Sequence, residues 1–250
     1  MDRLADRTVL VSGGAGPMGE AIAERCLAEG ARVVLADRSA KRVQAAQQRL
    51  APADRLLAET ADMLDAASVA ALFAATRARF GEVDGIVNVV GGVAGSALRT
   101  PLLELGDEQF DATLHVNLRG ILQTARQAVA AMRRRGRGRI VNVSSVSMAG
   151  EAGQADYSAA KAGVAALTRT MAIEFAPEVT VNCIAPSLIR TRVLERVDPA
   201  LLAQWRDRTL LKRLGEPIDV AHAAVFLLSD ESSFITGVQL PVSGGIWPAL

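Results

Sequence analysis

Aromatic residues and cysteines are scarce in this sequence. Only 4% of the 250 residues are aromatic, with a single tyrosine, and there are two cysteines, Cys26 and Cys183. The cysteines lie far apart, and no further Cys or His is close enough in sequence to form a metal-ligand pattern. We interpret both as buried thiols and expect no bound metal.

Long hydrophobic runs and net charge are also lacking. No stretch approaches the roughly 20 apolar residues that a membrane span needs, and charges stand in the opening MDRLADRTVLVSGG where a signal peptide would be apolar. Lys and Arg number 28 against 27 Asp and Glu, so the net charge of +1 creates no field for nucleic acid or an anionic membrane. We therefore expect a cytoplasmic protein whose partner is a small molecule.

The strongest local concentration of charge is a run of five arginines. An anionic partner is one interpretation of this run. We favour a structural one, because Gly136 and Gly138 are typical of a helix end, where cations complement the helix dipole. The run comprises Arg133, Arg134, Arg135, Arg137 and Arg139.

Short β-branched runs alternate with longer helical patterns along the whole chain. This alternation is typical of parallel strands joined by crossover helices. It predicts an α/β fold, a single-domain Rossmann-like doubly wound parallel sheet of about seven strands over residues 1–250, with helices on both faces. Strands are expected at 8–12, 32–36, 55–58, 86–89, 139–143, 180–184 and 238–242. Helices are expected at 21–29, 40–50, 67–80, 108–118, 121–134 and 219–228, with a long helix ending near 175 and a partly helical excursion over 190–214.

A glycine-rich turn follows the first predicted strand directly and leads into a helix. It reads Ser12-Gly-Gly-Ala-Gly-Pro-Met-Gly19, and a pyrophosphate can bind the N-terminus of such a helix. The alternative is an ordinary glycine-rich turn. Gly13, Pro17 and Met18 are the candidate cofactor contacts.

Asp37 follows the second predicted strand in VVLADRS. A carboxylate at this place accepts hydrogen bonds from an adenosine ribose, which selects NAD over NADP. The adjacent Arg38 offsets part of the repulsion of a ribose phosphate and keeps NADP open. A surface aspartate at the start of a turn is the structural alternative.

Tyr157 and Lys161 are four residues apart at the start of a predicted helix, so both side chains emerge on one face. A phenol titrates near pH ~10, and a neighbouring ammonium lowers that pKa. Tyr157 is therefore the candidate proton donor and acceptor. The same spacing also occurs by chance in many helices.

Seven motifs in order over nearly the whole chain resemble the classical short-chain dehydrogenase/reductase family. They are SGGAGPMG, Asp62, NVVG from Asn88, Asn117, VNVSS, YSAAK and APSLIRT. The resemblance implies a nicotinamide-dependent enzyme with a Ser-Tyr-Lys-Asn tetrad, and tetramers are common in the family. In this sequence the tetrad positions are Asn117, a serine of VNVSS, Tyr157 and Lys161.

The resemblance also implies a role for each position. Tyr157 exchanges a proton with the substrate oxygen, Lys161 lowers its pKa and binds the nicotinamide ribose, the serine holds the substrate oxygen and Asn117 holds a water. Further cofactor contacts carried over from the family lie near adenine, along the fourth strand and near the nicotinamide amide. They are Asp62, Met63, Asn88, Gly91, Pro186, Ile189 and Thr191.

The catalytic serine is either Ser144 or Ser145. The family's usual distance of thirteen residues to the tyrosine gives Ser144, whereas the second serine of VNVSS gives Ser145. Adjacent residues on a strand face opposite ways, so only one of the two hydroxyls reaches the substrate. We assign Ser145, with a one-residue deletion in the loop 147–153.

Two departures from the family pattern bear on the cofactor site. Pro17 stands at the place of the middle glycine and lacks an N–H, although proline suits the first position of a helix. Asn88-Val-Val-Gly91 replaces the usual NNAG.

The segment at about 190–214 is where the family builds its substrate lid. Its apolar residues suit an apolar ketone or secondary alcohol, whereas its arginines suit an acidic or carrier-bound substrate. The apolar residues are Val193, Leu194, Val197, Leu201, Leu202, Trp205, Leu210 and Leu211.

Three interpretations of function remain open. The first is an NAD-linked dehydrogenase of secondary alcohols, and the second is a 3-oxoacyl-carrier-protein reductase that uses NADPH, which GQADYSAAKAG resembles. The third is a catalytically silent protein that senses a nucleotide.

Overall fold

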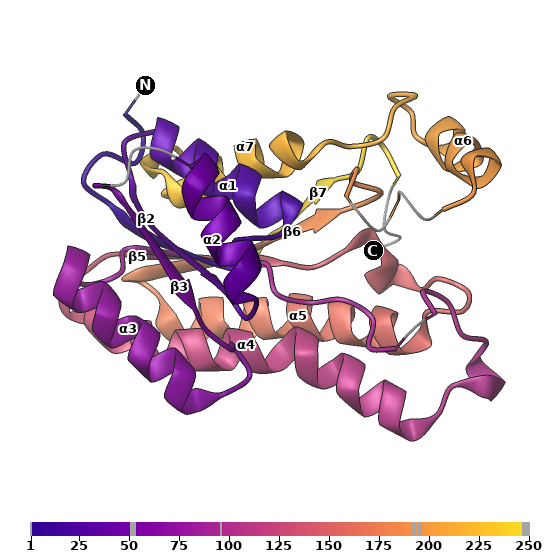
Figure 1. Cartoon of the computed structure of the whole chain (residues 1–250), viewed down its shortest axis with the longest axis horizontal. Helices are drawn as coiled ribbons and strands as arrows, with labels where there is room; N and C mark the ends of the chain where they lie inside the picture. The colour runs from indigo at the N-terminus through magenta and orange to yellow at the C-terminus, as the bar shows by residue number, and fades with distance from the viewer. Residues whose placement is uncertain (1, 51–53, 96, 192–193, 195–196, 247–250) are drawn as a thin grey trace.

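Seven parallel strands form one sheet in the computed structural model of the chain (Figure 1). Their order is β3-β2-β1-β4-β5-β6-β7, and every neighbouring pair is parallel. The structure describes residues 2–50, 54–95, 97–191, 194 and 197–246. The predicted doubly wound α/β fold is confirmed. The strands are β1 (Thr8–Ser12), β2 (Arg32–Asp37), β3 (Leu56–Thr60), β4 (Gly85–Asn88), β5 (Gly138–Val143), β6 (Val179–Pro186) and β7 (Gln239–Val242).

Helices cover both faces of this sheet (Figure 1). One face carries α1 (Pro17–Ala28), α2 (Ala40–Arg49) and α7 (Pro217–Leu228), and the other carries α3 (Ala66–Phe80), α4 (Asp107–Arg134) and α5 (Ala155–Phe175). The helix α6 (Pro199–Arg208) stands apart from both layers (Figure 1). Short 3-10 turns are η1 (Leu102–Glu104), η2 (Val146–Ala149) and η4 (Asp230–Ser232).

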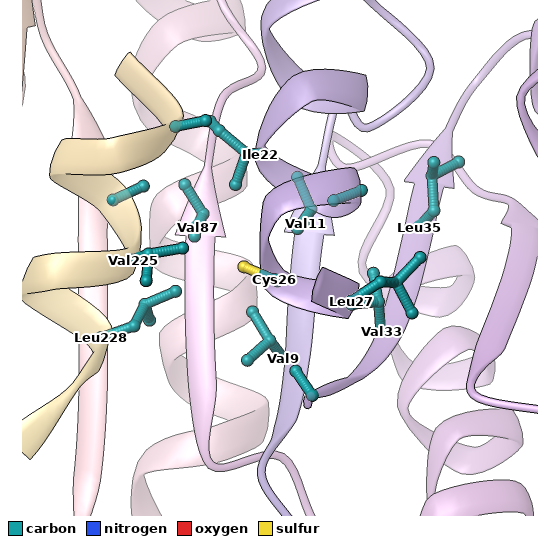
Figure 2. Packing of buried hydrophobic residues seen from close by; sticks show 14 of the residues in the cluster. Val9, Val11, Ile22, Cys26, Leu27, Val33, Leu35, Val87, Val225 and Leu228 are labelled. Atoms are coloured by element: carbon teal, nitrogen blue, oxygen red, sulfur yellow. The ribbon is translucent and has the colours of Figure 1, made fainter. Parts of the chain in front are cut away.

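Successive strand residues belong to two separate cores, one on each face of the sheet. Val9 and Val11 of β1 pack with α1 and α7, whereas Leu10 between them packs with the helices of the other face. Figure 2 shows Ile22 and Cys26 of α1 among the valines of the central strands, with α7 beside them. A strand of a parallel sheet that is buried on both faces is apolar throughout, which explains the continuous runs in the sequence.

The structure corrects the prediction of two helices over 108–118 and 121–134. A single helix, α4, runs through both segments, because Gly120 is helical and buried. A Cβ atom at position 120 would lie 3.2 Å from the Cβ of Met63, so glycine here permits a close approach and does not end the helix. The first helix also begins four residues earlier than predicted, with Pro17 at its first position.

Arginines at the end of α4 and the start of β5 bind carbonyl and carboxylate oxygens of this chain. Arg135 donates to the carbonyl of Val83 and, at 3.0 Å, to Asp84 Oδ1. Arg133 donates to the carbonyl of Glu174, and Arg139 lies 3.4 Å from Asp230. These contacts agree with the structural interpretation of the arginine run.

Membrane-spanning helices, metal-binding groups and disulfides are absent from the described residues. None of the helices in this part of the chain is long and apolar enough to cross a membrane. Within the same residues, no group of three or more His, Cys, Asp or Glu is arranged to hold a metal ion. Cys26 and Cys183 are both buried as free thiols.

Replacing Ile22 with alanine should lower the free energy of unfolding by about 2–5 kcal/mol, because its fully buried side chain would leave a cavity between α1 and the sheet. Ile218→Ala removes the same atoms from a side chain that is 43% exposed, and should cost roughly 1 kcal/mol or less. Urea unfolding at 25 °C measures both. Equal losses for the two variants would contradict the core described above.

Candidate active site

A cavity of about 370 Å³ opens beside the carboxyl ends of β4, β5 and β6. This is the edge at which ligands bind in doubly wound sheets, and the volume suits a small molecule. Eight residues that the sequence analysis assigned to the catalytic tetrad or to cofactor contacts line it. They are Met18, Gly91, Ser145, Tyr157, Lys161, Pro186, Ile189 and Thr191.

Tyr157 and Lys161 project into this cavity from the first two turns of α5. The Lys161 ammonium lies 5.5 Å from the centroid of the Tyr157 ring, within the range of a cation–π contact. Its Nζ donates to the carbonyl of Val143 at the end of β5, at 2.9 Å. The predicted pairing of the two side chains on one helix face is thus present.

Burial determines the protonation of this pair. It raises the pKa of the Tyr157 phenol, and hydrogen bonding from Ser145 offsets part of that rise. The sequence predicts instead that Lys161 lowers this pKa. Removal from water outweighs such an effect in the structure, and it also lowers the pKa of Lys161 itself, to about 8.

The two adjacent serines after β5 have different surroundings. The hydroxyl of Ser144 donates to the carbonyl of Lys161 at 2.8 Å, so this side chain is bound to the backbone of α5. The Ser145 side chain lowers the pKa of the Tyr157 phenol, and its Oγ accepts from the N–H of Ser147 at 3.2 Å. Ser144 is thus bound to the backbone of α5, whereas Ser145 is the serine whose side chain acts on the tyrosine.

Asn117 lies in α4 and supports the turn that follows β4. Its Oδ1 accepts from the N–H of Gly92 at 3.1 Å, and its Nδ2 donates to the carbonyl of Gly92 at 2.8 Å. A Cβ atom at Gly91 would lie 2.4 Å from Asn117 Oδ1 and 2.9 Å from Lys161 Nζ. Only glycine lets this turn pass so close to both side chains.

The Asn88 side chain binds other side chains of the protein, whereas the sequence analysis expects it to contact the cofactor. Its buried amide donates to Asn142 Oδ1 at 2.9 Å and accepts from Thr124 Oγ1 at 3.0 Å. The side chain therefore links β4 to β5 and α4 beneath the cavity. The two valines that replace the middle residues of NNAG leave this link in place.

The glycine-rich turn holds Pro17 at the first position of α1, with Gly16 as the N-cap and no side-chain cap. In the described part of the chain, the N–H groups of Met18 and Gly19 have no hydrogen-bond acceptor. Gly19 has no room for a side chain, because a Cβ there would lie 2.2 Å from the carbonyl oxygen of Gly13. Unpaired donors on a positive helix end fit an anion such as a pyrophosphate.

Asp37 ends β2 with its carboxylate buried, while Arg38 is exposed. Its Oδ1 accepts from the N–H of Ser39 at 3.0 Å and from Arg42 Nη2 at 2.7 Å. Within the described residues, Oδ2 has no hydrogen-bond donor. One oxygen of Asp37 is thus available to a hydroxyl.

The two residues expected near adenine differ in exposure. Asp62 is exposed and its carboxylate accepts from the N–H of Leu64 at 2.9 Å, whereas Met63 is buried against Gly120. The loop between β4 and α4 contributes Leu98 and Arg99 to the cavity lining. The sequence analysis missed these two residues, although a loop at the carboxyl end of β4 is a place to expect ligand contacts.

Comparison with known proteins agrees with this geometry. A family model described as enoyl-(acyl carrier protein) reductase matches residues 13–246. An uncharacterised oxidoreductase of Mycobacterium bovis is 43% identical over 96% of both chains. A (2S)-[(R)-hydroxy(phenyl)methyl]succinyl-CoA dehydrogenase subunit of Thauera aromatica is 37% identical over 97% of both chains. The crystal structure of a levodione reductase superposes with a TM-score of 0.90 at 34% identity, covering 97% of this chain and 98% of that one.

The fold and the residues that line the cavity define a nucleotide-binding oxidoreductase. The chain belongs to the short-chain dehydrogenase/reductase family, whose members use NAD or NADP.

The two serines provide a matched pair of substitutions. Ser145→Ala should lower kcat by about 10²- to 10³-fold, the usual effect of removing a donor to a developing oxyanion. Ser144→Ala removes a hydrogen bond to the backbone of α5, so it should cost about 1 kcal/mol of stability and lower kcat far less. Steady-state kinetics and thermal unfolding of both variants measure these effects. A larger loss of kcat in Ser144→Ala would transfer the role to Ser144.

Proposed function

We propose that this protein oxidises a secondary alcohol or reduces the corresponding ketone, with NAD(H) as its cofactor. The observation that carries the proposal is the convergence of Ser145, Tyr157 and Lys161 on one cavity beside the anion-binding end of α1. Two relatives support the reaction class, since one is named for dehydrogenating a hydroxy compound and another for reducing levodione.

The chain's own residues divide the work at the substrate oxygen. Tyr157 gives a proton to this oxygen in the reductive direction and takes one in the oxidative direction. Ser145 holds the same oxygen before charge develops on it. When bound, the nicotinamide supplies or accepts the hydride.

Lys161 and Asn117 act from behind Tyr157. The buried Lys161 ammonium provides positive charge beside the phenol and donors for a ribose. Asn117 holds the Gly91–Gly92 turn against Lys161 and is well placed to hold a water next to it. The N–H groups of Met18 and Gly19 fit the pyrophosphate of the cofactor.

Asp37 favours NAD over NADP. Its unused carboxylate oxygen suits a ribose hydroxyl and would repel a ribose phosphate. Arg38 and Arg42 lie beside it and would offset part of that repulsion, but Arg42 is already paired with Asp37 at 2.7 Å. This pairing leaves the exposed Arg38 as the main cation that opposes the preference.

An apolar substrate matches most of the described cavity lining. Leu98, Leu188, Leu194, Val197 and Trp205 all contribute to it. The segment 190–214 serves as the substrate lid in this proposal. Val193, one of the apolar residues that the sequence analysis names in this segment, lies outside the described residues.

A carrier-bound 3-oxoacyl substrate with NADPH is the second candidate. Two arginines of the cavity lining, Arg99 and Arg208, favour this candidate. A guanidinium can bind a phosphate or carboxylate of a carrier-bound substrate. A panel of simple ketones, alcohols and 3-oxoacyl thioesters, assayed with both nicotinamide cofactors, separates the two. A silent nucleotide sensor would turn over none of them.

We further propose a cytoplasmic homotetramer. The free thiols of Cys26 and Cys183 suit a reducing compartment. Fully exposed apolar side chains such as Leu103 and Phe234 suit burial against other copies of the chain. Light scattering of the purified protein measures the assembly, and a monomer would contradict this part of the proposal.

Tyr157→Phe should lower kcat by about 10²- to 10⁴-fold while the Kd for NAD stays close to that of the wild type. The substitution removes the hydroxyl and keeps the ring, so packing at the start of α5 is preserved. Lys161→Ala is the contrasting variant and should weaken both turnover and cofactor binding. Steady-state kinetics and calorimetric titration separate the two effects. Substantial turnover by Tyr157→Phe would refute the proposed mechanism.

Replacing Asp37 with alanine should narrow the ratio of kcat/KM for NAD over NADP, because the acceptor for the ribose hydroxyl is lost. Arg38→Ala should widen the same ratio, since it removes the cation that favours a ribose phosphate. Both cofactors are compared with one substrate at one ionic strength. A wild-type enzyme that prefers NADP would overturn the assignment.

A further inference from the structure

The residue directly before Tyr157 is a buried carboxylate that the proposed mechanism does not use. Asp156 is 2% exposed and lies in the first turn of α5. A carboxylate removed from water costs free energy unless donors surround it. The donors that surround Asp156 therefore show what it holds in place.

Asp156 accepts three hydrogen bonds, one from α5 and two from α4. Its Oδ1 accepts from the N–H of Tyr157 at 2.8 Å. Its Oδ2 accepts from Thr113 Oγ1 at 2.9 Å and from Gln109 Nε2 at 3.1 Å. Thr113 and Gln109 both belong to α4, so the carboxylate joins the start of α5 to α4.

Thr113 extends this connection to Asn117 and to the turn after β4. Its hydroxyl, while donating to Asp156, accepts from the N–H of Ala94 at 3.0 Å. Its carbonyl accepts from Asn117 Nδ2 at 2.8 Å. One buried threonine thus contacts the residue before Tyr157, the residue that supports Gly91–Gly92, and the loop that lines the cavity.

We propose that Asp156 is a positioning residue that, through Thr113, sets Tyr157 of α5 against Asn117 of α4 and the loop after β4. This inference rests on the proposed function, because it assigns a role in the reaction that Tyr157 performs. A carboxylate suits the place, since it accepts several hydrogen bonds at once and its negative charge complements the positive end of α5.

The loss of this connection should act on turnover more than on binding. Tyr157 must lie within hydrogen-bond reach of the substrate oxygen, and a small misplacement of a catalytic group costs up to about 10²-fold in rate. The cofactor contacts at the start of α1 lie on a different element and are unaffected. The expected signature is a fall in kcat that exceeds any rise in the Kd for NAD, since of the cofactor contacts only Gly91 and Lys161 adjoin this network.

Thr113→Val tests the connection, because valine keeps the shape of threonine and lacks the hydroxyl. Thr76→Val is its matched control, since Thr76 is 1% exposed in α3 and, among the described residues, its hydroxyl bonds only to the carbonyl of Leu72. We expect kcat to fall by about tenfold or more in Thr113→Val and to change little in Thr76→Val. Thr113→Ser, which retains a hydroxyl, should recover most of the loss. Equal kcat values for Thr113→Val and Thr76→Val, or no recovery in Thr113→Ser, would overturn the proposal.

Two variants of Asp156 show whether Thr113 acts through the carboxylate. Asp156→Ala removes both carboxylate oxygens and so all three hydrogen bonds, whereas Asp156→Asn keeps an acceptor for the Tyr157 N–H, so Asp156→Asn should retain the higher kcat. Thr113→Val should cause no further loss in an Asp156→Ala background, because residues in one network are not additive. Fully additive losses would show that Thr113 acts through Ala94 alone and would overturn the proposal.

Hydrogen exchange of the Tyr157 amide provides a readout independent of turnover. The exchange rate should rise in Asp156→Ala and in Thr113→Val, and stay unchanged in Thr76→Val. A wild-type enzyme that is inactive with every ketone and alcohol would refute the proposed function, and the positioning role would fail with it. A wild-type enzyme that requires Tyr157 but tolerates Thr113→Val would refute the positioning role alone.

Discussion

Two hydrogen bonds between α5 and the end of β5 fix the geometry on which the candidate active site depends. Ser144 Oγ donates to the carbonyl of Lys161 at 2.8 Å, and Lys161 Nζ donates to the carbonyl of Val143 at 2.9 Å. The first bond holds Ser144 against α5, whereas Ser145 is the serine whose side chain acts on Tyr157. The second holds the ammonium beside the phenol. Both acceptors are backbone carbonyls of regular elements and move only if those elements move.

A buried polar network beneath the cavity joins the same elements a second time. Asn88 of β4 donates to Asn142 of β5 at 2.9 Å, and Asn142 donates to Thr168 of α5 at 2.9 Å. Apolar residues would fill this space with less desolvation of polar groups. A fully satisfied network instead rigidifies the elements that it joins. The two elements that carry Tyr157, Lys161 and Ser145 to the cavity, α5 and β5, are therefore connected both at the site and below it.

The sequence predicted most of the fold and the central residues of the site, and the reasons differ between the two. The strands were predictable because each is buried on both faces and reads as an apolar run between turns. Spacing places Tyr157 and Lys161 on one helix face, but it was the set of motifs resembling the short-chain dehydrogenase/reductase family that assigned them to the site. The continuity of α4 through Gly120 was not predictable. The glycine serves the close packing of Met63, and a contact of this kind does not show in a local sequence pattern. Asp156 and Thr113 were missed for the same reason, because they bond to each other across a separation of 43 residues in the sequence.

The pKa values of Tyr157 and Lys161 could not be predicted from the sequence, because they depend on burial. Spacing alone suggests that Lys161 lowers the pKa of Tyr157, but the structure adds burial, which raises the pKa of the phenol and lowers that of Lys161 to about 8. Both shifts favour the neutral form of the group concerned. The shift of Lys161 still leaves an ammonium at neutral pH, because its pKa of about 8 lies above 7. The raised pKa of Tyr157 keeps the proton on the phenol, and a protonated phenol is the form that can give a proton to an oxygen on which negative charge develops.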